Sequence, residues 1–287
     1  MTSAKRADED RNDNLRIGEL PELHIVSLDE VVLHEDPDME RVARLVDRFS
    51  ADRVLKNPPV VGRADGRRQR IVLDGANRVT ALRMLDYRHV LAQEIDLADP
   101  GLILESWHHA IEHLNPEALL THARSVTGVS VREGEETTLE APDALVRFRF
   151  ADGSSAVLFG AADLMERVAQ LHAVTRIYHR FADFDRVSYT NMEHLRRHYR
   201  NFTALISFPL FDRQDLLQIT ANDRRVPSGI TRVLLPKRAL CFNLQLEILR
   251  AGLSLEEKEA WLQQTIREKV ADKSIRFYRE PTFFFNE

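Results

Sequence analysis

The sequence predicts an α+β protein, because segments with helical periodicity alternate with short strands and with one β-rich stretch. Apolar residues recur at helical spacing in residues 38–50, 164–178 and 255–270. Residues 126–159 instead alternate apolar and polar positions around Asp152-Gly153, a typical turn. Neither an all-helical nor an all-β chain fits both patterns.

Composition restricts the class of protein. The chain has 287 residues, of which 44% are hydrophobic and 30% are charged, as in globular proteins. No apolar run has membrane-spanning length, and no secretory apolar segment follows Met1. A single cysteine, Cys241, excludes a disulfide within the chain and agrees with a reducing compartment. We therefore expect a cytoplasmic protein with no membrane partner.

Net charge bears on nucleic-acid binding. The formal charge is −5, whereas sequence-independent binding to duplex DNA depends on many lysines and arginines that neutralise phosphates. Composition therefore argues against a nucleic-acid partner, although a local basic patch is not excluded. The oligomeric state cannot be predicted from the sequence.

The first third of the chain divides into short elements. Residues 2–14 are polar and without periodicity, which predicts a disordered tail. The rigid segment Lys56-Asn57-Pro58-Pro59 leads into a strand that can pair with the next one across the Asp65-Gly66 turn. The expected elements are strands at 23–26, 31–33, 60–61 and 69–73 and a helix at 38–50.

Residues 70–85 predict a buried strand, a turn and a helix. Asp74 suits a helix N-cap, Gly75 allows a tight turn, and Arg78 lies in the first helical turn. Free backbone N–H groups and the positive end of the helix dipole meet at the same place, which favours an anion. The alternative is an ordinary strand–turn–helix with a solvated arginine.

The remaining chain shows no single pattern of apolar residues. Its segments change between apolar alternation and helical spacing, and residues 216–220 fit a strand or a helix equally well. The expected strands lie at 90–97 and 205–210, and the expected helices lie at 102–113, 115–122 and 192–200.

Three groups of residues could carry chemistry. Asp74 to Arg78 could hold a phosphate, with Asp74 as a possible ligand of Mg²⁺. Glu35 closes an apolar segment and could act as a general base, although Asp36-Pro37 more often serves only to begin a helix. Ser228 to Arg232 combine hydroxyls, backbone donors and a guanidinium that suit a carboxylate or a phosphate. An exposed polar loop is the alternative for this third group.

Histidine pairs offer a weaker signal. His109/His113 and His194/His198 have the i,i+4 spacing of metal ligands on a helix, but no HExxH motif or nearby cysteine accompanies them. We expect structural or surface roles for them.

Two segments together resemble a known family. The strand pair around residues 60–73 and the sequence Asp74-Gly-Ala-Asn-Arg78 resemble the ParB/sulfiredoxin-like superfamily, in which this turn holds nucleotide phosphates. Residues 225–240, which read RVPSGITRVLLPKRAL, narrow the match to the free L-serine kinases of that superfamily. The resemblance covers about residues 20–115 and 200–250.

The resemblance implies phosphorylation of the side-chain hydroxyl of free L-serine, with ATP or ADP as the phosphoryl donor and Mg²⁺ as the metal. Glu35 matches the position of the general base, and Asp74 matches a residue implied in catalysis and in Mg²⁺ binding. The remaining implied site residues bind nucleotide (Asp74, Gly75, Ala76, Asn77 and Arg78) or substrate (Trp107, Thr231 and Arg232).

This chain departs from the family pattern at a few positions. Archaeal members carry histidines in place of Ala76 and Asn77, and a histidine commonly stands in place of Val233. Because backbone groups grip the phosphate, the first change should be tolerated, whereas the second bears on which amino acid is bound. The donor (ATP, ADP or CTP) and the acceptor (serine, threonine, homoserine or a related amino acid) stay open.

The same resemblance predicts the domain organisation. We expect a tail at 1–15, a ParB-like nucleotide-binding domain at 16–122, and a mixed α/β domain at 123–287 that completes the substrate site. The rival function is a ParB-like, nucleotide-gated DNA-binding transcriptional regulator, which would place a helix-turn-helix where this chain has its β-rich segment. A sulfiredoxin-like enzyme would need a cysteine in the phosphate turn, and the only cysteine is Cys241.

Overall fold

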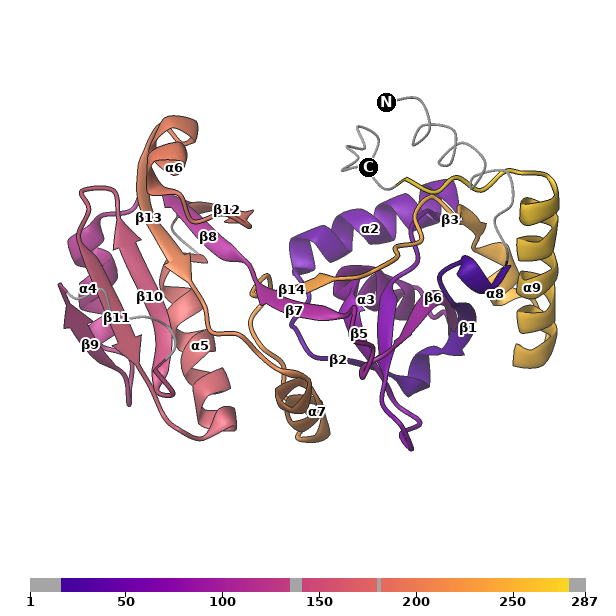
Figure 1. Cartoon of the computed structure of the whole chain (residues 1–287), viewed down its shortest axis with the longest axis horizontal. Coiled ribbons are helices and arrows are strands. Elements are labelled where there is room, and N and C mark those ends of the chain that lie inside the picture. The colour runs from indigo at the N-terminus through magenta and orange to yellow at the C-terminus, as the bar shows by residue number, and fades with distance from the viewer. Residues whose placement is uncertain (1–16, 135–140, 180–181, 279–287) are drawn as a thin grey trace, which may run out of the picture.

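The protein folds into two lobes, each built around one main sheet (Figure 1). The computed structural model describes residues 17–134, 141–179 and 182–278. The expected N-terminal tail lies outside the described residues. Both sheets carry helices, so the α+β class is confirmed.

The sheet of the first lobe has five strands in the order β1-β6-β4-β5-β2. As expected, β4 and β5 form an antiparallel pair, with Val61 opposite Val72. β2 runs parallel to β5, so the carboxyl ends of these two strands lie at the same edge. The strands are β1 (Leu23–Ser27), β2 (Val31–Leu33), β4 (Val60–Arg63), β5 (Arg70–Asp74) and β6 (His89–Asp96).

Two helices of this lobe position the candidate site. α2 (Met39–Asp52) begins at Asp38, whose side chain accepts two backbone N–H bonds, and it buries Val42 and Phe49. α3 (Ala76–Met84) follows β5 directly and packs against α2. The predicted helices at these places are confirmed.

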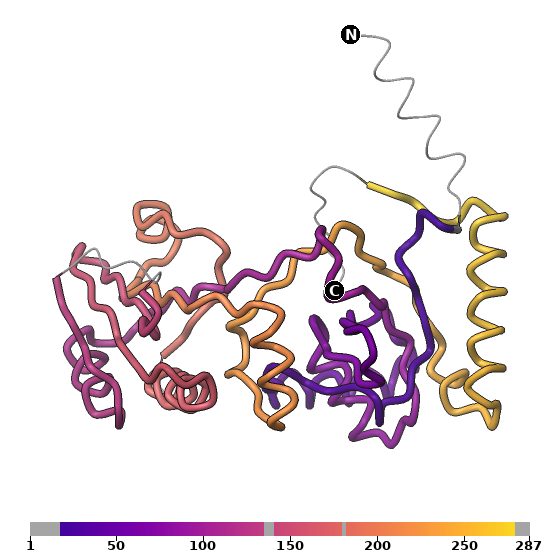
Figure 2. Tube along the Cα trace, turned by 60° about the horizontal axis from the view of Figure 1, so that its bottom comes forward, coloured from indigo at the N-terminus to yellow at the C-terminus, as the bar shows by residue number. Residues whose placement is uncertain are grey.

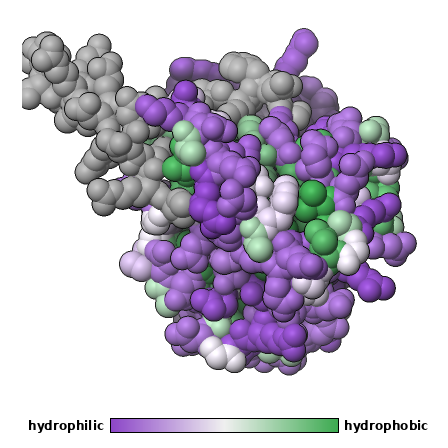
Figure 3. Space-filling model, turned by 90° about the vertical axis from the view of Figure 1, so that its right-hand side faces the viewer, coloured by the Kyte–Doolittle hydropathy of each residue, from purple (hydrophilic) through white to green (hydrophobic). Residues whose placement is uncertain are grey.

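The end of the described chain returns to the first lobe. β15 (Leu244–Gln245) pairs with β3 (Val54–Leu55), and α9 (Leu255–Ala271) packs on β1. The face of the molecule on the side of α9 is mainly hydrophilic, with scattered apolar side chains (Figure 3). Periodicity therefore located α9 correctly, but only the folded chain shows which sheet it covers.

The second lobe is an antiparallel sheet of six strands in the order β12-β8-β13-β10-β11-β9. The expected β-rich segment supplies three of these strands. The strands are β8 (His108–Glu112), β9 (Ser130–Glu133), β10 (Ala144–Phe150), β11 (Ser155–Phe159), β12 (Asp183–Val187) and β13 (Phe202–Ser207), and the helices are α4 (Pro116–Arg124), α5 (Leu164–His179) and α6 (Met192–His198).

The helix predicted at residues 102–113 is wrong. This segment forms β7 (Ile103–Ser106) and β8, and β8 lies between β12 and β13. Ala110 and Ile111 are fully buried there, so pairing with two neighbouring strands outweighs local helical spacing. The undecided residues 216–220 belong to helix α7 (Arg213–Ala221), which has a capping box at Asp212.

The chain crosses between the lobes twice, and the crossing segments lie side by side (Figures 1 and 2). β7 leads out of the first lobe, and β14 (Thr231–Leu234) pairs with it on the way back. The sheets therefore divide the chain differently from the expected boundary at residue 122: β8 already belongs to the second sheet, and residues 244–271 pack on the first. In the described parts of the chain, no helix combines the length and apolarity needed to cross a bilayer.

Candidate active site

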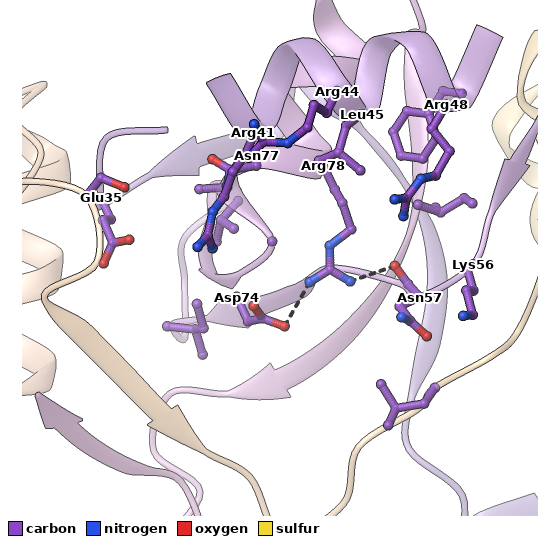
Figure 4. Close-up of a pocket in the computed structure, with 18 of the residues that line it drawn as sticks. Glu35, Arg41, Arg44, Leu45, Arg48, Lys56, Asn57, Asp74, Asn77 and Arg78 are labelled. Atoms are coloured by element: carbon purple, nitrogen blue, oxygen red, sulfur yellow. Dashed lines mark hydrogen bonds and ion pairs between the residues drawn. The ribbon is translucent and has the colours of Figure 1, made fainter. Parts of the chain in front are cut away.

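A pocket of about 920 Å³ lies where the two lobes meet. Figure 4 shows Glu35 at one end of it, Lys56 at the other, and Arg78 between them below α2. Its lining comes from both lobes and includes most of the residues predicted to bind ligand. Among the predicted site residues, it is lined by Glu35, Asp74, Gly75, Ala76, Asn77, Arg78, Trp107 and Thr231.

The parallel pairing of β2 and β5 brings two acidic residues to one edge. Glu35 follows β2, and Asp74 ends β5. The backbone on either side of Glu35 is fixed by Val226, whose N–H donates to His34 O at 2.8 Å and whose carbonyl accepts from Asp36 N at 2.9 Å. A residue of the return crossing therefore holds the predicted base in place.

Asp74 is bound by two guanidinium groups. Its Oδ2 accepts from Arg78 Nη2 at 2.9 Å and from Arg238 Nη2 at 2.6 Å. Burial would raise the pKa of Asp74, but the two arginines outweigh burial and hold the pKa below its usual value. Asp74 is therefore ionised at neutral pH and fixes both arginines at the turn.

The turn itself requires glycine. Gly75 has φ +98° and is the N-cap of α3, without a side-chain cap, so the predicted N-cap at Asp74 is wrong by one residue. A Cβ at Gly75 would lie 2.8 Å from Pro59 Cβ and 3.0 Å from Arg78 Nε. The uncapped first turn leaves backbone N–H groups that can bind an anion.

Ala76 and Asn77 differ in what they do. Asn77 Oδ1 accepts from Asp38 N at 2.8 Å and so ties the start of α3 to the start of α2. Ala76 begins α3 and lines the pocket. The side chain at position 77 therefore positions α2, in addition to any contact with ligand.

Glu35 accepts three hydrogen bonds from one loop. Gly229 N donates to Oε1 at 2.8 Å, while Thr231 N at 3.1 Å and Thr231 Oγ1 at 2.5 Å donate to Oε2. Gly229 has φ +83°, and a Cβ there would collide with the guanidinium of Arg186. The loop that was predicted to bind an anion therefore binds the carboxylate of Glu35, and its role in binding substrate stays a prediction.

His109 binds the backbone of this loop. It is fully buried, and its Nε2 donates to Gly229 O at 2.9 Å, while its Nδ1 lies 2.7 Å from the Tyr178 hydroxyl. Burial lowers the pKa of His109 to about 3, so the ring is neutral. The predicted structural role is confirmed for this histidine, although it lies on a strand and not on a helix.

Arg232 is not among the residues that line the pocket. Its Nη1 pairs with Glu105 Oε2 at 2.7 Å, and its guanidinium lies 4.9 Å from the centre of the Trp107 ring. Trp107 does line the pocket. A substrate-binding role for Arg232 stays a prediction, and the contacts seen here are with Trp107 and Glu105.

Sequence reasoning missed Arg186 of β12. This side chain lines the pocket, donates through Nη2 to Ser228 Oγ at 3.2 Å, and has no ion pair within the described residues. Burial lowers the pKa of Arg186, and the nearby Glu35 opposes this effect. Its position depends on β12 pairing with β8, which no local motif indicates.

The basic face of α2 was also missed. Arg41, Arg44 and Arg48 line the pocket with i, i+3 and i+7 spacing, and Lys56 lies at its far end (Figure 4). This spacing is visible in the sequence, since it places the three arginines on one face of a helix. The pocket is thus strongly basic around Asp74, which suits a polyphosphate.

The residues fit Mg²⁺ only in part. No cluster of three or more histidine, cysteine, aspartate or glutamate residues that could bind a metal occurs within the described ranges. Mg²⁺ in phosphoryl-transfer sites commonly takes one or two carboxylates and completes its shell with phosphates and water. Asp74 offers such a carboxylate, because both of its ion pairs are made by Oδ2.

Comparison with known proteins shows which family this chain resembles. No protein-family model matches the chain. It is 22% identical over 272 residues to the ATP-dependent L-serine kinase SbnI of Staphylococcus aureus (strain NCTC 8325 / PS 47), covering 92% of this chain and 97% of that protein.

Solved structures agree with this similarity. SbnI from Staphylococcus aureus with a C-terminal truncation has a TM-score of 0.69 at 20% identity, covering 86% of this chain and 96% of that chain. A glutamate-to-alanine variant of a free serine kinase in complex with ADP has a TM-score of 0.68 at 12% identity, covering 80% and 95%. The chain has the fold of these kinases, and its predicted resemblance to the free L-serine kinase family is confirmed.

Proposed function

We propose that the protein is an ATP- or ADP-dependent kinase that transfers the terminal phosphoryl group to the side-chain hydroxyl of free L-serine. The observation that carries this proposal is the position of Glu35. Three donors hold its carboxylate in the same pocket as the Asp74–Arg78 turn. A base and a phosphate site in one cavity are the parts that phosphoryl transfer to a hydroxyl requires.

The nucleotide phosphates bind at the start of α3. Backbone N–H groups of the first turn and the guanidinium of Arg78 face this position, and Arg44 and Arg48 supply further positive charge from α2. Arg238 adds a second guanidinium beside Asp74. The first lobe thus acts as a ParB-like nucleotide-binding module.

Asp74 is the residue that would hold Mg²⁺. When bound, the ion would neutralise charge that develops on the phosphates during transfer. The carboxylate of Asp74 also keeps Arg78 and Arg238 oriented, so it contributes to phosphate binding through both guanidinium groups.

The amino acid binds between Glu35 and the second lobe. Arg186 offers a planar fork for the α-carboxylate, and Trp107 closes the side of the pocket. Glu35 then accepts the proton of the serine hydroxyl as its oxygen attacks the terminal phosphorus. Positioning of the two substrates supplies much of the catalysis, since a bound geometry replaces a bimolecular encounter.

The relatives favour this function over DNA-binding regulation. SbnI is named an ATP-dependent L-serine kinase, which supports ATP as the donor, and a free serine kinase has been solved with ADP. In this chain, the segment after β6 enters the ribbon β7 and the second sheet. With Cys241 as the only cysteine, we keep the proposal of a cytoplasmic enzyme.

A substrate panel tests the proposal. The protein is incubated with Mg²⁺, with each of ATP, ADP and CTP, and with serine, threonine or homoserine, and the phosphoamino acid is detected by mass. We expect O-phosphoserine with ATP or ADP. A salt-sensitive shift of DNA without any phosphoamino acid would favour the regulator instead.

A further inference from the structure

A buried histidine, His34, is connected to the predicted base Glu35 through Thr231. His34 is 3% exposed, and its Nε2 lies 2.8 Å from Thr231 Oγ1. The same Thr231 oxygen lies 2.5 Å from Glu35 Oε2. His34, Thr231 and Glu35 therefore form an unbroken chain of hydrogen-bonding atoms that begins inside the first lobe and ends in the pocket.

The other nitrogen of His34 fixes its tautomer. Nδ1 lies 2.5 Å from the carbonyl oxygen of Val72, and a carbonyl only accepts, so Nδ1 carries a proton. Burial lowers the pKa of His34 more than the nearby Glu35 raises it, so the resting ring is neutral. Nε2 is then a bare acceptor that faces the Thr231 hydroxyl.

In this resting state, the three side chains share too few protons to form both hydrogen bonds of the chain. The Thr231 hydroxyl has a single hydrogen and two acceptors beside it, His34 Nε2 and Glu35 Oε2. It donates to the carboxylate, which is charged and therefore the stronger acceptor. The contact between Thr231 and His34 becomes a full hydrogen bond only when one further proton enters.

We propose that His34, Thr231 and Glu35 form a proton relay, in which the proton that Glu35 takes from the substrate hydroxyl is shared through Thr231 with His34. The inference rests on the proposed kinase function for the source of that proton. His34 and Thr231 act through Glu35 and are positioning residues, whereas Glu35 is the group that touches the substrate.

The proposed step balances. The O–H bond of serine breaks and its oxygen bonds to the terminal phosphorus, while the bond from that phosphorus to the bridging oxygen breaks and leaves its electron pair on the nucleotide. Glu35 Oε2 takes the proton. It passes a proton to Thr231 Oγ1 as the Thr231 hydrogen moves to His34 Nε2. The reverse transfer returns the proton to Glu35, which releases it to solvent when product leaves.

Kinetics test the relay through a split between kcat and KM. We expect Thr231→Val to lower kcat by about tenfold or more, because general-base catalysis contributes about 10²–10⁴-fold. KM for the nucleotide should change less than about twofold, since the Thr231 hydroxyl bonds to His34 and Glu35 and not to the Asp74–Arg78 turn. Thr231→Ser keeps the hydroxyl and should restore kcat to within about threefold.

A matched control separates the relay from loss of a buried hydroxyl. Thr175 is buried in α5, and its hydroxyl donates to Leu171 O at 3.0 Å. Thr175→Val should leave kcat unchanged. Unchanged kcat in a folded Thr231→Val protein, or failure of Thr231→Ser to restore it, would overturn the relay.

A second measurement does not depend on activity. The ¹⁵N resonance of His34 Nε2 is followed in the full chain as pH falls from about 7 to about 5. The proposal predicts an upfield shift in the wild type and in Thr231→Ser, and no shift in Thr231→Val. Charged Arg186 faces Glu35 in all three proteins, so it does not explain a difference between them.

The two measurements distinguish the relay from the proposed function. If the His34 Nε2 resonance shifts with pH by the same amount in the wild type and in Thr231→Val, the relay is overturned even if the protein makes phosphoserine. A Thr231-dependent shift in a protein that makes no phosphoamino acid would support the shared proton and contradict the kinase function.

Discussion

At Gly75, two separate constraints act on one residue. Its φ of +98° disfavours any residue with a Cβ, and a Cβ would also contact Pro59 and Arg78. Gly66 in the β4–β5 turn has φ +71°, but a Cβ added there would meet nothing within 4 Å. Substitutions at the two glycines therefore distinguish the effect of backbone strain from the effect of crowding at the Asp74–Arg78 turn.

We predict that Gly75→Ala destabilises the protein by about 1–3 kcal/mol and lowers nucleotide affinity, because the clash displaces Arg78. Gly66→Ala should cost about 1 kcal/mol and leave nucleotide affinity unchanged. Chemical denaturation and nucleotide titration measure the two effects. Equal nucleotide affinity in both variants would show that the turn does not bind phosphate.

At the scale of elements, α2 carries three of the arginines that line the pocket, Arg41, Arg44 and Arg48, on one face. We predict that Arg44→Ala and Arg48→Ala each weaken nucleotide binding about tenfold or more, since a charge-assisted hydrogen bond contributes about 1.5–3 kcal/mol. The dependence of affinity on salt should also become shallower. Arg196 on α6 is exposed in the other lobe, so Arg196→Ala is the control. Unchanged nucleotide affinity in both α2 variants would show that the phosphates do not bind at this face.

The contact between β1 and α9 is sensitive to pH. His24 Nδ1 lies 2.9 Å from Glu259 Oε1. This hydrogen bond raises the pKa of His24. Burial would raise the pKa of Glu259, but hydrogen bonds from His24 and Ile25 lower it overall. Both side chains are partly exposed, at 39% and 29%, so the pair contributes only up to about 1 kcal/mol.

The sign of the pH effect follows from these two shifts. The His24 contribution is complete below its unfolded pKa of about 6.5 and is lost as pH rises through its raised pKa. The Glu259 contribution is lost as pH falls through its lowered pKa. We predict that His24→Gln destabilises the protein at about pH 5.5 and has a smaller effect at about pH 8.5. Denaturation at both pH values checks this, and an equal cost at the two would contradict it.

Local elements were predictable where a signal is contiguous in the sequence. The turn at Asp74, the helix α2 and the pairing of β4 with β5 follow from neighbouring residues. Residues 102–113 were predicted wrongly because their conformation depends on strands far away in the chain. Arg186, Arg238 and His34 were missed for the same reason, since tertiary pairing alone brings them to the pocket.

At the scale of the whole molecule, the pocket depends on both lobes. The first lobe supplies the Asp74–Arg78 turn and α2, and β12 of the second lobe supplies Arg186. The crossing segments between the lobes include the loop that holds Glu35. If these parts bind the two substrates as we propose, we expect nucleotide binding and amino-acid binding to be separable by mutation.

We predict that Arg186→Ala raises KM for serine about tenfold or more and leaves nucleotide affinity unchanged, because the variant lacks the guanidinium that we propose binds the α-carboxylate. Arg186→Lys should lie between, since lysine keeps the charge but not the planar fork. Arg186→Ala should also lose the preference for serine over ethanolamine, which lacks the carboxylate. A retained preference would place the carboxylate elsewhere.

The most direct test of the kinase function compares the wild type with Glu35→Gln in the presence of Mg²⁺, ATP and L-serine, with products followed by ³¹P NMR. We expect O-phosphoserine in the wild type and a kcat lower by about 10²–10⁴-fold in the variant. ATP affinity should stay within about threefold, because the hydrogen bonds of the Glu35 carboxylate, within the described residues, come from the loop at residues 229–231 and not from the Asp74–Arg78 turn. Full activity of Glu35→Gln would contradict the assignment of the base, and absence of any phosphoamino acid in the wild type would contradict the function itself.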